Sequence, residues 1–236
     1  MQLDELTQGA LVALPPPVAG VQLWSCPLAR SEDEVRGLAQ LLSPAETARA
    51  RRFGTAILRD RYIVGRAALR MLLGRRLTLD PARVIIERGP RGRPFAADAG
   101  DLDFNVAHTD GLALIGITVG QRIGVDIEHA ERCVNVEGVA RKFMTSNERD
   151  ALSPLAANVR RVALLRLWTC KEAMSKATGD ALSAPFRAID IAPGVRPELV
   201  AGPAPYAPGA WALHAMTVRG HYLATVALWQ GDSHHG

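Results

Sequence analysis

The chain has 236 residues, of which 48% are hydrophobic, 22% charged and 5% aromatic, a composition typical of a folded globular protein. No apolar run approaches the roughly 18 residues that span a bilayer, and no basic segment leads into an apolar core at the N-terminus, so we expect a cytoplasmic protein that does not bind a membrane. The net charge of +4 is modest, and the three cysteines fit no C-x-x-C spacing, which excludes a disulfide framework and a zinc knuckle.

The N-terminal part of the chain predicts a strand followed by two short helices. Residues 1–19 contain three consecutive prolines and indicate a loose lead-in, whereas residues 21–26 favour a strand. Two capping-box patterns then predict one helix to about residue 42 and another directly after it. The two boxes are Ser31 with Glu34 and Ser43 with Glu46.

A longer helix is predicted from Thr55 to Leu73, because leucines and a tyrosine form an apolar stripe and Gly74 provides a stop. Arginines crowd the other faces of this helix. Residues 49–93 hold thirteen arginines against three acidic residues, hence +10 locally and −6 over the remainder of a +4 chain. One part of the chain therefore suits an anion, and the other part suits a cation.

After a strand near residues 84–86, three more strands are predicted as consecutive hairpins. Because side chains alternate along a strand, Asp126 and Glu128 share one face of the last strand. An up-down-up order brings the ends of the first and third strands together, which places His108 near both carboxylates. The three strands cover residues 102–107, 112–119 and 123–128.

The rest of the chain repeats this order of elements in outline. A helix at residues 136–142 and a capping box of Thr145 with Glu148 precede a long helix at about 159–178, which ends before Gly179. Each half thus runs strand, short helices, long helix and strands, which indicates a structural duplication. The remaining predictions are a strand at 189–191, a Pro/Gly-rich loop at 193–209, a hairpin of 210–218 with 222–229, and a frayed tail at 231–236.

The two carboxylates on one strand face admit two interpretations. They repel by roughly 0.6 kcal/mol in water and by about 2.5 kcal/mol in a cleft of effective dielectric near 20, and a solvated strand face is the commoner case. Glu172 and Lys176 alone would ordinarily form a surface ion pair. Taken together with the two strand carboxylates and His108, however, they form a pattern that favours a cation site. Three carboxylates with few nitrogen or sulfur ligands suit Mg²⁺, with Mn²⁺ as the alternative.

The loop at residues 88–94 is dense in arginine, glycine and proline. Arginine clusters most often indicate a solvated or nucleic-acid-binding surface, but this stretch has few aromatic residues and no nucleic-acid module. A Gly-Arg-Pro turn among arginines suits a compact phosphate, because guanidinium groups bind phosphate bidentately and glycine lets backbone N–H groups approach. We therefore expect a phosphorylated small molecule and no nucleic acid.

The chain carries three motifs, F-N-V-A-H-T at 104–109, G-V-D-I-E at 124–128 and W-T-C-K-E-A-x-x-K at 168–176. In their order and spacing these motifs resemble the 4′-phosphopantetheinyl transferases, above all the larger, surfactin-synthetase-activating type. The resemblance covers roughly residues 43–179 and implies an α+β pseudo-dimer of two similar halves, acting as a monomer. Residues 1–119 would carry the nucleotide-binding arginines, and residues 120–236 the metal-binding carboxylates and the catalytic helix.

The resemblance implies a holo-[acyl-carrier-protein] synthase reaction. With Mg²⁺, a serine of an apo acyl or peptidyl carrier protein attacks the β-phosphate of coenzyme A, takes the 4′-phosphopantetheine and releases 3′,5′-bisphosphoadenosine. Such carriers serve fatty-acid, polyketide or nonribosomal-peptide synthesis.

Roles for individual residues also follow from the resemblance. Asp126, Glu128 and Glu172 would bind the metal. The catalytic set would be Asp126, Glu172, which helps to deprotonate the serine directly or through water, and Lys176, which steadies the phosphates. Arg52 and Arg66 are weaker candidates for the nucleotide. The implied coenzyme A contacts are Arg49, Arg61, Arg91, Gly92, Arg93, Pro94, His108, Thr109 and Lys176.

The chain departs from the family at two positions. Ala107 stands where a serine is usual, and Glu46 stands where a basic residue is often found. A basic, partly apolar lip at residues 141–144 is a hypothesis for the carrier contact. Two rival functions are a nucleic-acid-binding module that uses the arginine-rich half and a catalytically silent coenzyme A binder.

Overall fold

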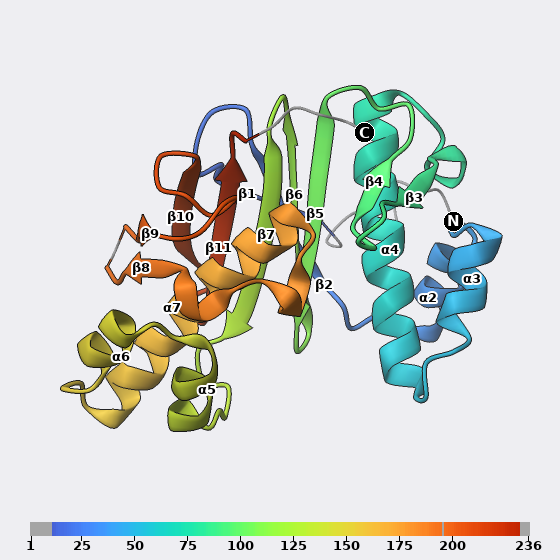
Figure 1. The fold of residues 1–236 in the computed structure, drawn as a ribbon. Coiled ribbons are helices and arrows are strands. Elements are labelled where there is room, and N and C mark those ends of the chain that lie inside the picture. Colours follow the sequence, from blue (N-terminus) through green and yellow to red (C-terminus); the bar gives the residue numbers. More distant parts are fainter. Residues whose placement is uncertain (1–10, 195, 232–236) are drawn as a thin grey trace.

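The computed structural model describes residues 11–194 and 196–231 (Figure 1). Its helices are α2 (Glu32–Ala39), α3 (Pro44–Ala50), α4 (Ala56–Leu77), α5 (Val136–Phe143), α6 (Ser146–Leu152) and α7 (Ala157–Thr178). Its strands are β1 (Val12–Leu14), β2 (Gln22–Pro27), β3 (Ile86–Arg88), β4 (Pro94–Ala96), β5 (Leu102–Thr109), β6 (Leu112–Val119), β7 (Arg122–His129), β8 (Asp190–Ala192), β9 (Glu198–Ala201), β10 (Trp211–Val218) and β11 (Tyr222–Trp229). Short 3₁₀ turns cover Pro81–Arg83, Ala181–Ser183 and Phe186–Ala188.

The two halves of the chain share one order of elements, which confirms the predicted α+β pseudo-dimer. The series β2-α2-α3-α4-β3-β4-β5-β6 corresponds element by element to β7-α5-α6-α7-β8-β9-β10-β11. The matched helices have 8, 7 and 22 residues in both halves. The sheets correspond too, with orders β2-β6-β5 and β7-β11-β10, and β1 is added outside β2.

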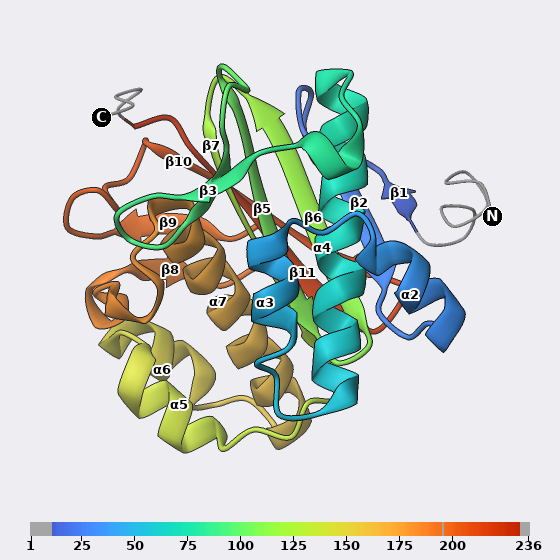
Figure 2. The ribbon, with the colours of Figure 1, turned by 90° about the vertical axis from the view of Figure 1, so that its right-hand side faces the viewer.

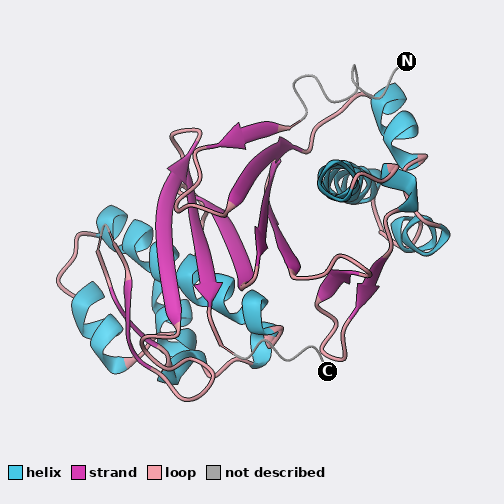
Figure 3. Ribbon diagram, turned by 90° about the horizontal axis from the view of Figure 1, so that it is seen from above, coloured by secondary structure: helices cyan, strands magenta, loops and turns pink. Residues whose placement is uncertain are grey.

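The two sheets lie in the middle of the molecule and the helices cover their outer faces (Figures 2 and 3). One core lies between α4 and the first sheet, and includes Leu69 and Phe104. A second lies between α7 and the second sheet and includes Met174. A third, with Leu114 and Val125, joins the inner faces of both sheets. None of the helices in the described part of the chain combines the length and apolar character that crossing a bilayer requires.

Local sequence signals account for most helix boundaries. The capping boxes predicted at Ser31, Ser43 and Thr145 all form. In each of these three helices the capping hydroxyl accepts from the N–H group of the third helical residue, which fixes where the helix begins. Gly179 ends α7 in the left-handed conformation, with φ of 84°, because a glycine meets no steric penalty there.

The prediction that Gly74 ends the first long helix is wrong. Helix α4 continues to Leu77 and ends at Thr78. A Cβ at Gly74 would lie 2.8 Å from the carbonyl oxygen of Leu79, so the glycine is needed where the chain folds back over the helix.

Three loop predictions also need correction. The lead-in contains β1, which pairs with β2, and the loop at 193–209 contains β9. The strand predicted at 102–107 continues through His108 and Thr109 as β5. Most of the predicted frayed tail, residues 232–236, lies outside the described residues.

The predicted three-strand meander is wrong at its last step. Strand β6 pairs with β5, but β7 leaves that sheet and pairs with β11. The free edges of β5 and β7 meet instead through side chains, because Asp103 accepts from the Ile123 N–H at 2.8 Å and Asn105 accepts from the Val125 N–H at 3.0 Å. We call this contact the junction.

Arg93 closes the junction with a single guanidinium group. Its two Nη atoms donate to the two carboxylate oxygens of Asp103, each at 2.7 Å, and Nη2 also donates to the carbonyl oxygen of Ile123 at 2.8 Å. Its Nε donates to the carbonyl oxygen of Lys176 at 2.9 Å. The Arg93 side chain is 7% exposed, and it thereby ties β5 to β7 and α7.

We predict that Asp103→Ala lowers the free energy of unfolding by about 3–5 kcal/mol, because removing one partner leaves the Arg93 charge buried without compensation. Equilibrium unfolding in urea measures the loss. The matched control is Asp101→Ala, on the exposed turn just before β5, which should cost under about 0.5 kcal/mol. Equal losses in the two variants would contradict a bracing role for Arg93.

Candidate functional site

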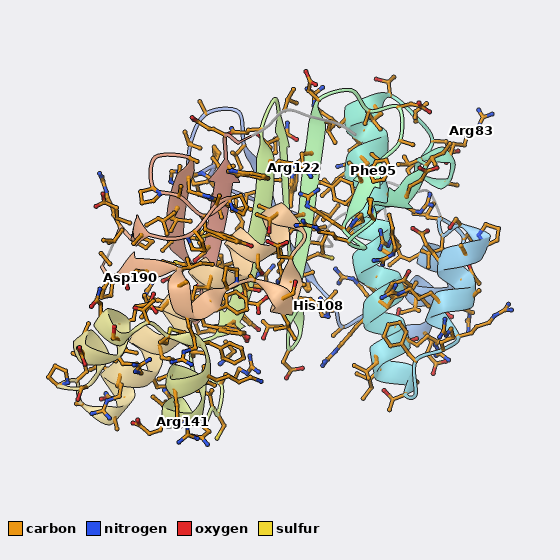
Figure 4. The ribbon with its side chains drawn as sticks, in the orientation of Figure 1. Arg83, Phe95, His108, Arg122, Arg141 and Asp190 are labelled. Atoms are coloured by element: carbon orange, nitrogen blue, oxygen red, sulfur yellow. The ribbon has the colours of Figure 1, made fainter. Side chains whose placement is uncertain are left out.

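A cleft of about 1140 Å³ lies along the junction, with walls from α3, α4, the β3–β4 turn, β5, β7 and the end of α7. All nine residues predicted to bind coenzyme A line it, and so does Glu128, whereas Asp126 and Glu172 do not. Figure 4 shows His108 between α4 and α7. The nine residues are Arg49, Arg61, Arg91, Gly92, Arg93, Pro94, His108, Thr109 and Lys176.

One end of the cleft carries three arginines around one tyrosine. The Cζ atoms of Arg49 and Arg66 lie 5.7 and 5.9 Å from the centre of the Tyr62 ring. Burial lowers the pKa of Arg88, and the charges of Arg49 and Arg66 lower it further. Among the described residues, Arg66 Nη1 and the Tyr62 hydroxyl are buried without a hydrogen-bond partner. This end is therefore built to receive an anion.

Sequence reasoning missed Tyr62 and Arg88 and ranked Arg66 low. Tyr62 lies on the stripe that was assigned to the core of the long helix, and Arg88 precedes the Gly-Arg-Pro turn. Only the fold of the β3–β4 turn onto α4 brings both to the cleft.

Glu46, one of the two departures from the family pattern, holds the arginine-rich end in place. Its Oε2 accepts from Arg70 Nε at 2.7 Å, and its Oε1 lies 3.4 Å from Arg66 Nε. The Ser43 N–H, part of the capping box of α3, donates to the same carboxylate at 2.9 Å. Glu46 therefore fixes Arg66 through Nε and leaves the outer end of that guanidinium group available.

The other predicted arginines differ in how they are engaged. Arg61 forms an ion pair with Asp110 at 2.5 Å, and Arg91 forms one with Asp180. Most donors of Arg93 serve the junction. Arg52 does not line the cleft.

Glu128 and Lys176 line the opposite, acidic end of the cleft. Asp126 is 7% exposed and lies directly behind this end, paired with Lys176. Its Oδ1 accepts from Lys176 Nζ at 2.6 Å, whereas its Oδ2 is buried without a partner among the described residues. Burial raises the pKa of Asp126, and Lys176 opposes that shift. Lys176 thus pairs across to β7 rather than with Glu172 one turn earlier on its own helix.

Glu128 and Glu172 surround Asp126 electrostatically. Glu128 pairs with Arg132 and accepts from Thr109 Oγ1 at 3.3 Å. Burial raises the pKa of both glutamates; Arg132 opposes the shift at Glu128, and Lys176 opposes it at Glu172. The Asp126 charge raises both pKa values further. The three carboxylates are therefore close enough to repel one another.

These carboxylates do not stand in a finished metal-binding arrangement. Within residues 11–194 and 196–231, no group of three His, Cys, Asp or Glu side chains is set to hold a metal ion. Lys176 neutralises Asp126, and Arg132 neutralises Glu128, each through an ion pair. The orphaned Oδ2 of Asp126 nevertheless fits a hard cation, which carboxylate oxygens bind preferentially.

His108 lies between the two ends of the cleft. Burial lowers its pKa, and the charge of Lys176 lowers it further. At neutral pH the imidazole is therefore uncharged and can both donate and accept a hydrogen bond.

Gly124 explains how α7 reaches the acidic end. A Cβ on Gly124 would lie 1.8 Å from the carbonyl oxygen of Ala173, so helix and strand pack in direct backbone contact. Ile123, Val125 and Ile127 point to the opposite side, into the core between the sheets, as the alternation of side chains predicts. The close packing brings Lys176 over Asp126.

Lys171, in the third motif, does not line the cleft. Its ammonium is fully buried, 2.8 Å from Glu148, and it donates to the carbonyl oxygens of Phe186 and Ile189 at 2.7 and 2.6 Å. A buried lysine needs such partners. Lys171 therefore anchors α7 inside the second half and does not reach the cleft.

The predicted lip at residues 141–144 is only partly available for contact. Met144 is fully buried, and the Phe143 ring packs 4.8 Å from that of Trp168. Arg141 and Lys142 remain exposed, and Figure 4 shows Arg141 at the outer end of α5.

Two family models match the chain. The model described as "4′-phosphopantetheinyl transferase superfamily" covers residues 122–227, and the one described as "4′-phosphopantetheinyl transferase, N-terminal" covers residues 28–118. A crystal structure of a holo-(acyl-carrier-protein) synthase from Bacillus anthracis in complex with CoA aligns with 46% of this chain and 94% of its own, at a TM-score of 0.36 and 21% identity.

Relatives that match over most of their length agree with the two family models. The 4′-phosphopantetheinyl transferase HetI of Nostoc is 34% identical over 224 residues, which is 91% of this chain and 92% of HetI. The 4′-phosphopantetheinyl transferase of Bacillus subtilis is 24% identical over 165 residues, 70% of this chain and 71% of that protein. With HetI matched along nine-tenths of both chains, this chain belongs to the 4′-phosphopantetheinyl transferase superfamily.

Proposed function

We propose that the protein transfers the 4′-phosphopantetheine of coenzyme A to a serine of an apo acyl or peptidyl carrier protein, and releases 3′,5′-bisphosphoadenosine. The observation that carries this proposal is one cleft with arginines at one end and Glu128 in the wall at the other, where Asp126 and Glu172 lie close enough to repel Glu128 and each other. Membership of the family and the likeness to HetI support it. Neither rival function accounts for both ends of the cleft.

The two halves divide the work in this proposal. Residues 1–119 bind the nucleotide, and residues 120–236 bind the metal and carry the catalytic helix, so one monomer holds one complete site. The cytoplasmic location stays a prediction from the sequence.

The arginine-rich end receives the nucleotide phosphates. Arg49, Arg66 and Arg88 face one space, and the buried Nη1 of Arg66 lacks a partner that an anionic oxygen would supply. Charge-assisted hydrogen bonds from guanidinium groups are among the stronger kinds. We assign the 3′-phosphate of coenzyme A to this end, and the β3–β4 turn with His108 and Thr109 to the rest of the nucleotide and its pyrophosphate.

The acidic end takes Mg²⁺, or Mn²⁺ as the alternative. Asp126, Glu128 and Glu172 would hold it, after Lys176 and Arg132 release their ion pairs. When bound, a divalent ion neutralises charge on the pyrophosphate. The three carboxylates otherwise repel one another in a partly desolvated site, so a cation also relieves that cost.

The remaining chemistry falls to side chains on α7. Glu172 would accept the proton of the carrier serine, directly or through water, because its raised pKa makes it a better base than a solvated carboxylate. Lys176, once released from Asp126, would donate to the phosphate oxygens and to the departing bisphosphoadenosine. Arg141 and Lys142, exposed on α5, offer positive charge for an acidic carrier.

One incubation tests the function. The protein is mixed with coenzyme A, Mg²⁺ and an apo carrier domain, and the carrier is weighed by mass spectrometry. We expect a gain of one phosphopantetheine. If carriers of the fatty-acid, polyketide and peptide types all keep their mass, the transferase proposal is wrong. If the protein then still binds coenzyme A, the remaining function is that of a catalytically silent coenzyme A binder.

We predict that Asp126→Ala abolishes transfer while weakening coenzyme A binding far less, because Asp126 lies at the acidic end and the nucleotide contacts lie at the other. Rates come from the mass assay and affinities from calorimetry with coenzyme A. The matched control is Asp150→Ala, in α6 away from the cleft. Retained activity in Asp126→Ala would remove this residue from the metal site.

Arg66→Gln should raise the KM for coenzyme A roughly 10- to 100-fold, since a hydrogen bond to a charged group contributes about 1.5–3 kcal/mol. The preference for coenzyme A over dephospho-coenzyme A should shrink by a similar factor. Arg75→Gln, exposed near the end of the same helix, serves as the control. An unchanged preference would show that the 3′-phosphate lies elsewhere.

Gly124→Ala should lower kcat by about 100-fold, because the added Cβ forces α7 off β7 and moves Glu172 and Lys176 from their places. Gly54→Ala, where a Cβ meets nothing within 4 Å, should be neutral. Thermal unfolding run beside the mass assay separates lost activity from lost folding. A Gly124→Ala enzyme with normal kcat would contradict the close-packing account.

A further inference from the structure

A second cavity, of about 500 Å³, lies in the second half between α7, the turn after β8 and strand β10. It shares no lining residue with the cleft. Its volume falls within the range of roughly 300–1,000 Å³ that is typical of small-molecule sites. Its α7 wall consists of Val159, Val162, Ala163, Arg166, Leu167 and Cys170.

This wall is the counterpart of the α4 wall of the cleft, residue for residue. The α4 wall consists of Leu58, Arg61, Tyr62, Gly65, Arg66 and Leu69. Every member of the second set lies 101 positions after its counterpart, which is also the offset between the first residues of the two helices. The turn after β8 and strand β10 likewise correspond to the β3–β4 turn and β5. The structural duplication has therefore produced the same hollow twice.

The two hollows differ in their chemistry. Val162, Ala163 and Leu167 stand where the cleft has Arg61, Tyr62 and Arg66, so the second hollow lacks the groups that suit a nucleotide. The second hollow has a positively charged side chain at a different position, because Arg166 corresponds to Gly65 of the cleft. Among the described residues that line it, the second hollow is apolar with one guanidinium group.

Arg166 has room for an anionic partner. It donates from Nη2 to Thr217 Oγ1 at a long 3.4 Å, and within the described residues no carboxylate lies within 4 Å of it. Apolar side chains flank it on α7, and Val159 at the edge of the cavity is 50% exposed. One positive charge set in an apolar hollow complements a ligand with one negative charge and an apolar body.

We propose that this cavity binds a monocarboxylate with an apolar chain, such as a medium-chain fatty acid, with the carboxylate at Arg166 and the chain along Val159, Val162 and Leu167. The Cys170 thiol, 1% exposed, lies at the cavity wall. Burial raises the pKa of that thiol to about 12, so it stays protonated and contributes packing only. The site is separate from the transferase cleft and does not depend on the function proposed for it.

The test is titration of the full-length protein with decanoate, followed by calorimetry and by amide chemical shifts. We expect saturable binding of one decanoate, with shifts concentrated in residues 159–170 and 215–217. Arg166→Gln should weaken binding at least tenfold, and decanol, which lacks the carboxylate, should bind as weakly to the native protein. Arg187→Gln, an exposed arginine outside the cavity, is the matched control and should bind normally.

A second variant guards against misfolding of the first. Ala163→Trp fills the hollow and should abolish decanoate binding, while its transfer activity and coenzyme A affinity stay at the native level. Absence of saturable binding, equal affinity of native protein and Arg166→Gln, or displacement of decanoate by coenzyme A would each overturn the proposal. A further outcome would also overturn it: Arg166→Gln loses binding of an apo carrier but keeps binding of decanoate. That result would assign this face to a protein contact.

Discussion

The junction between β5 and β7 is the contact on which the rest of the structure depends. Two sheets meet there at their edges without a backbone ladder, and Asp103, Asn105 and Arg93 supply the hydrogen bonds that a ladder would make. A continuous sheet would have placed α4 and α7 on one surface and left no cleft between them. Because the edges meet through side chains, each half keeps its own helix layer, and the arginines of one half face the carboxylates of the other.

The charges at both ends of the cleft are partly neutralised by ion pairs within the protein, which limits the free-energy cost of holding them there. Internal countercharges restrain each end: Glu46 holds two arginines, and Lys176 and Arg132 hold two carboxylates. Ion pairs of this kind are near balance between desolvation and attraction, so a ligand can replace a protein partner without a large penalty. Under the proposed function, binding would therefore exchange one partner for another at these charges.

Much of this was predictable because it is local. Capping boxes, the glycine at the end of α7 and the alternation of Asp126 and Glu128 along β7 depend on residues within one turn or strand, and the structure has them all. The misplaced features are long-range. The turn at Gly120 predicts a hairpin between β6 and β7, but β7 pairs with β11, about a hundred residues later in the chain. Likewise the sequence around Arg93 predicts a phosphate ligand, but most of the Arg93 donors bond to the junction. Lys171 is buried because it forms an ion pair with Glu148 inside the second half.

Strand β1 has a consequence for assembly. The outer edge of β2 corresponds, by the duplication, to the edge of β7 on which the first half docks. A third half could add to β2 in the same head-to-tail manner, and a repeated heterologous contact gives a ring where its rotation closes and an open filament where it does not. Residues 12–14 pair with that edge and occupy its hydrogen-bonding groups. This three-residue strand therefore covers part of the edge to which a further half could add.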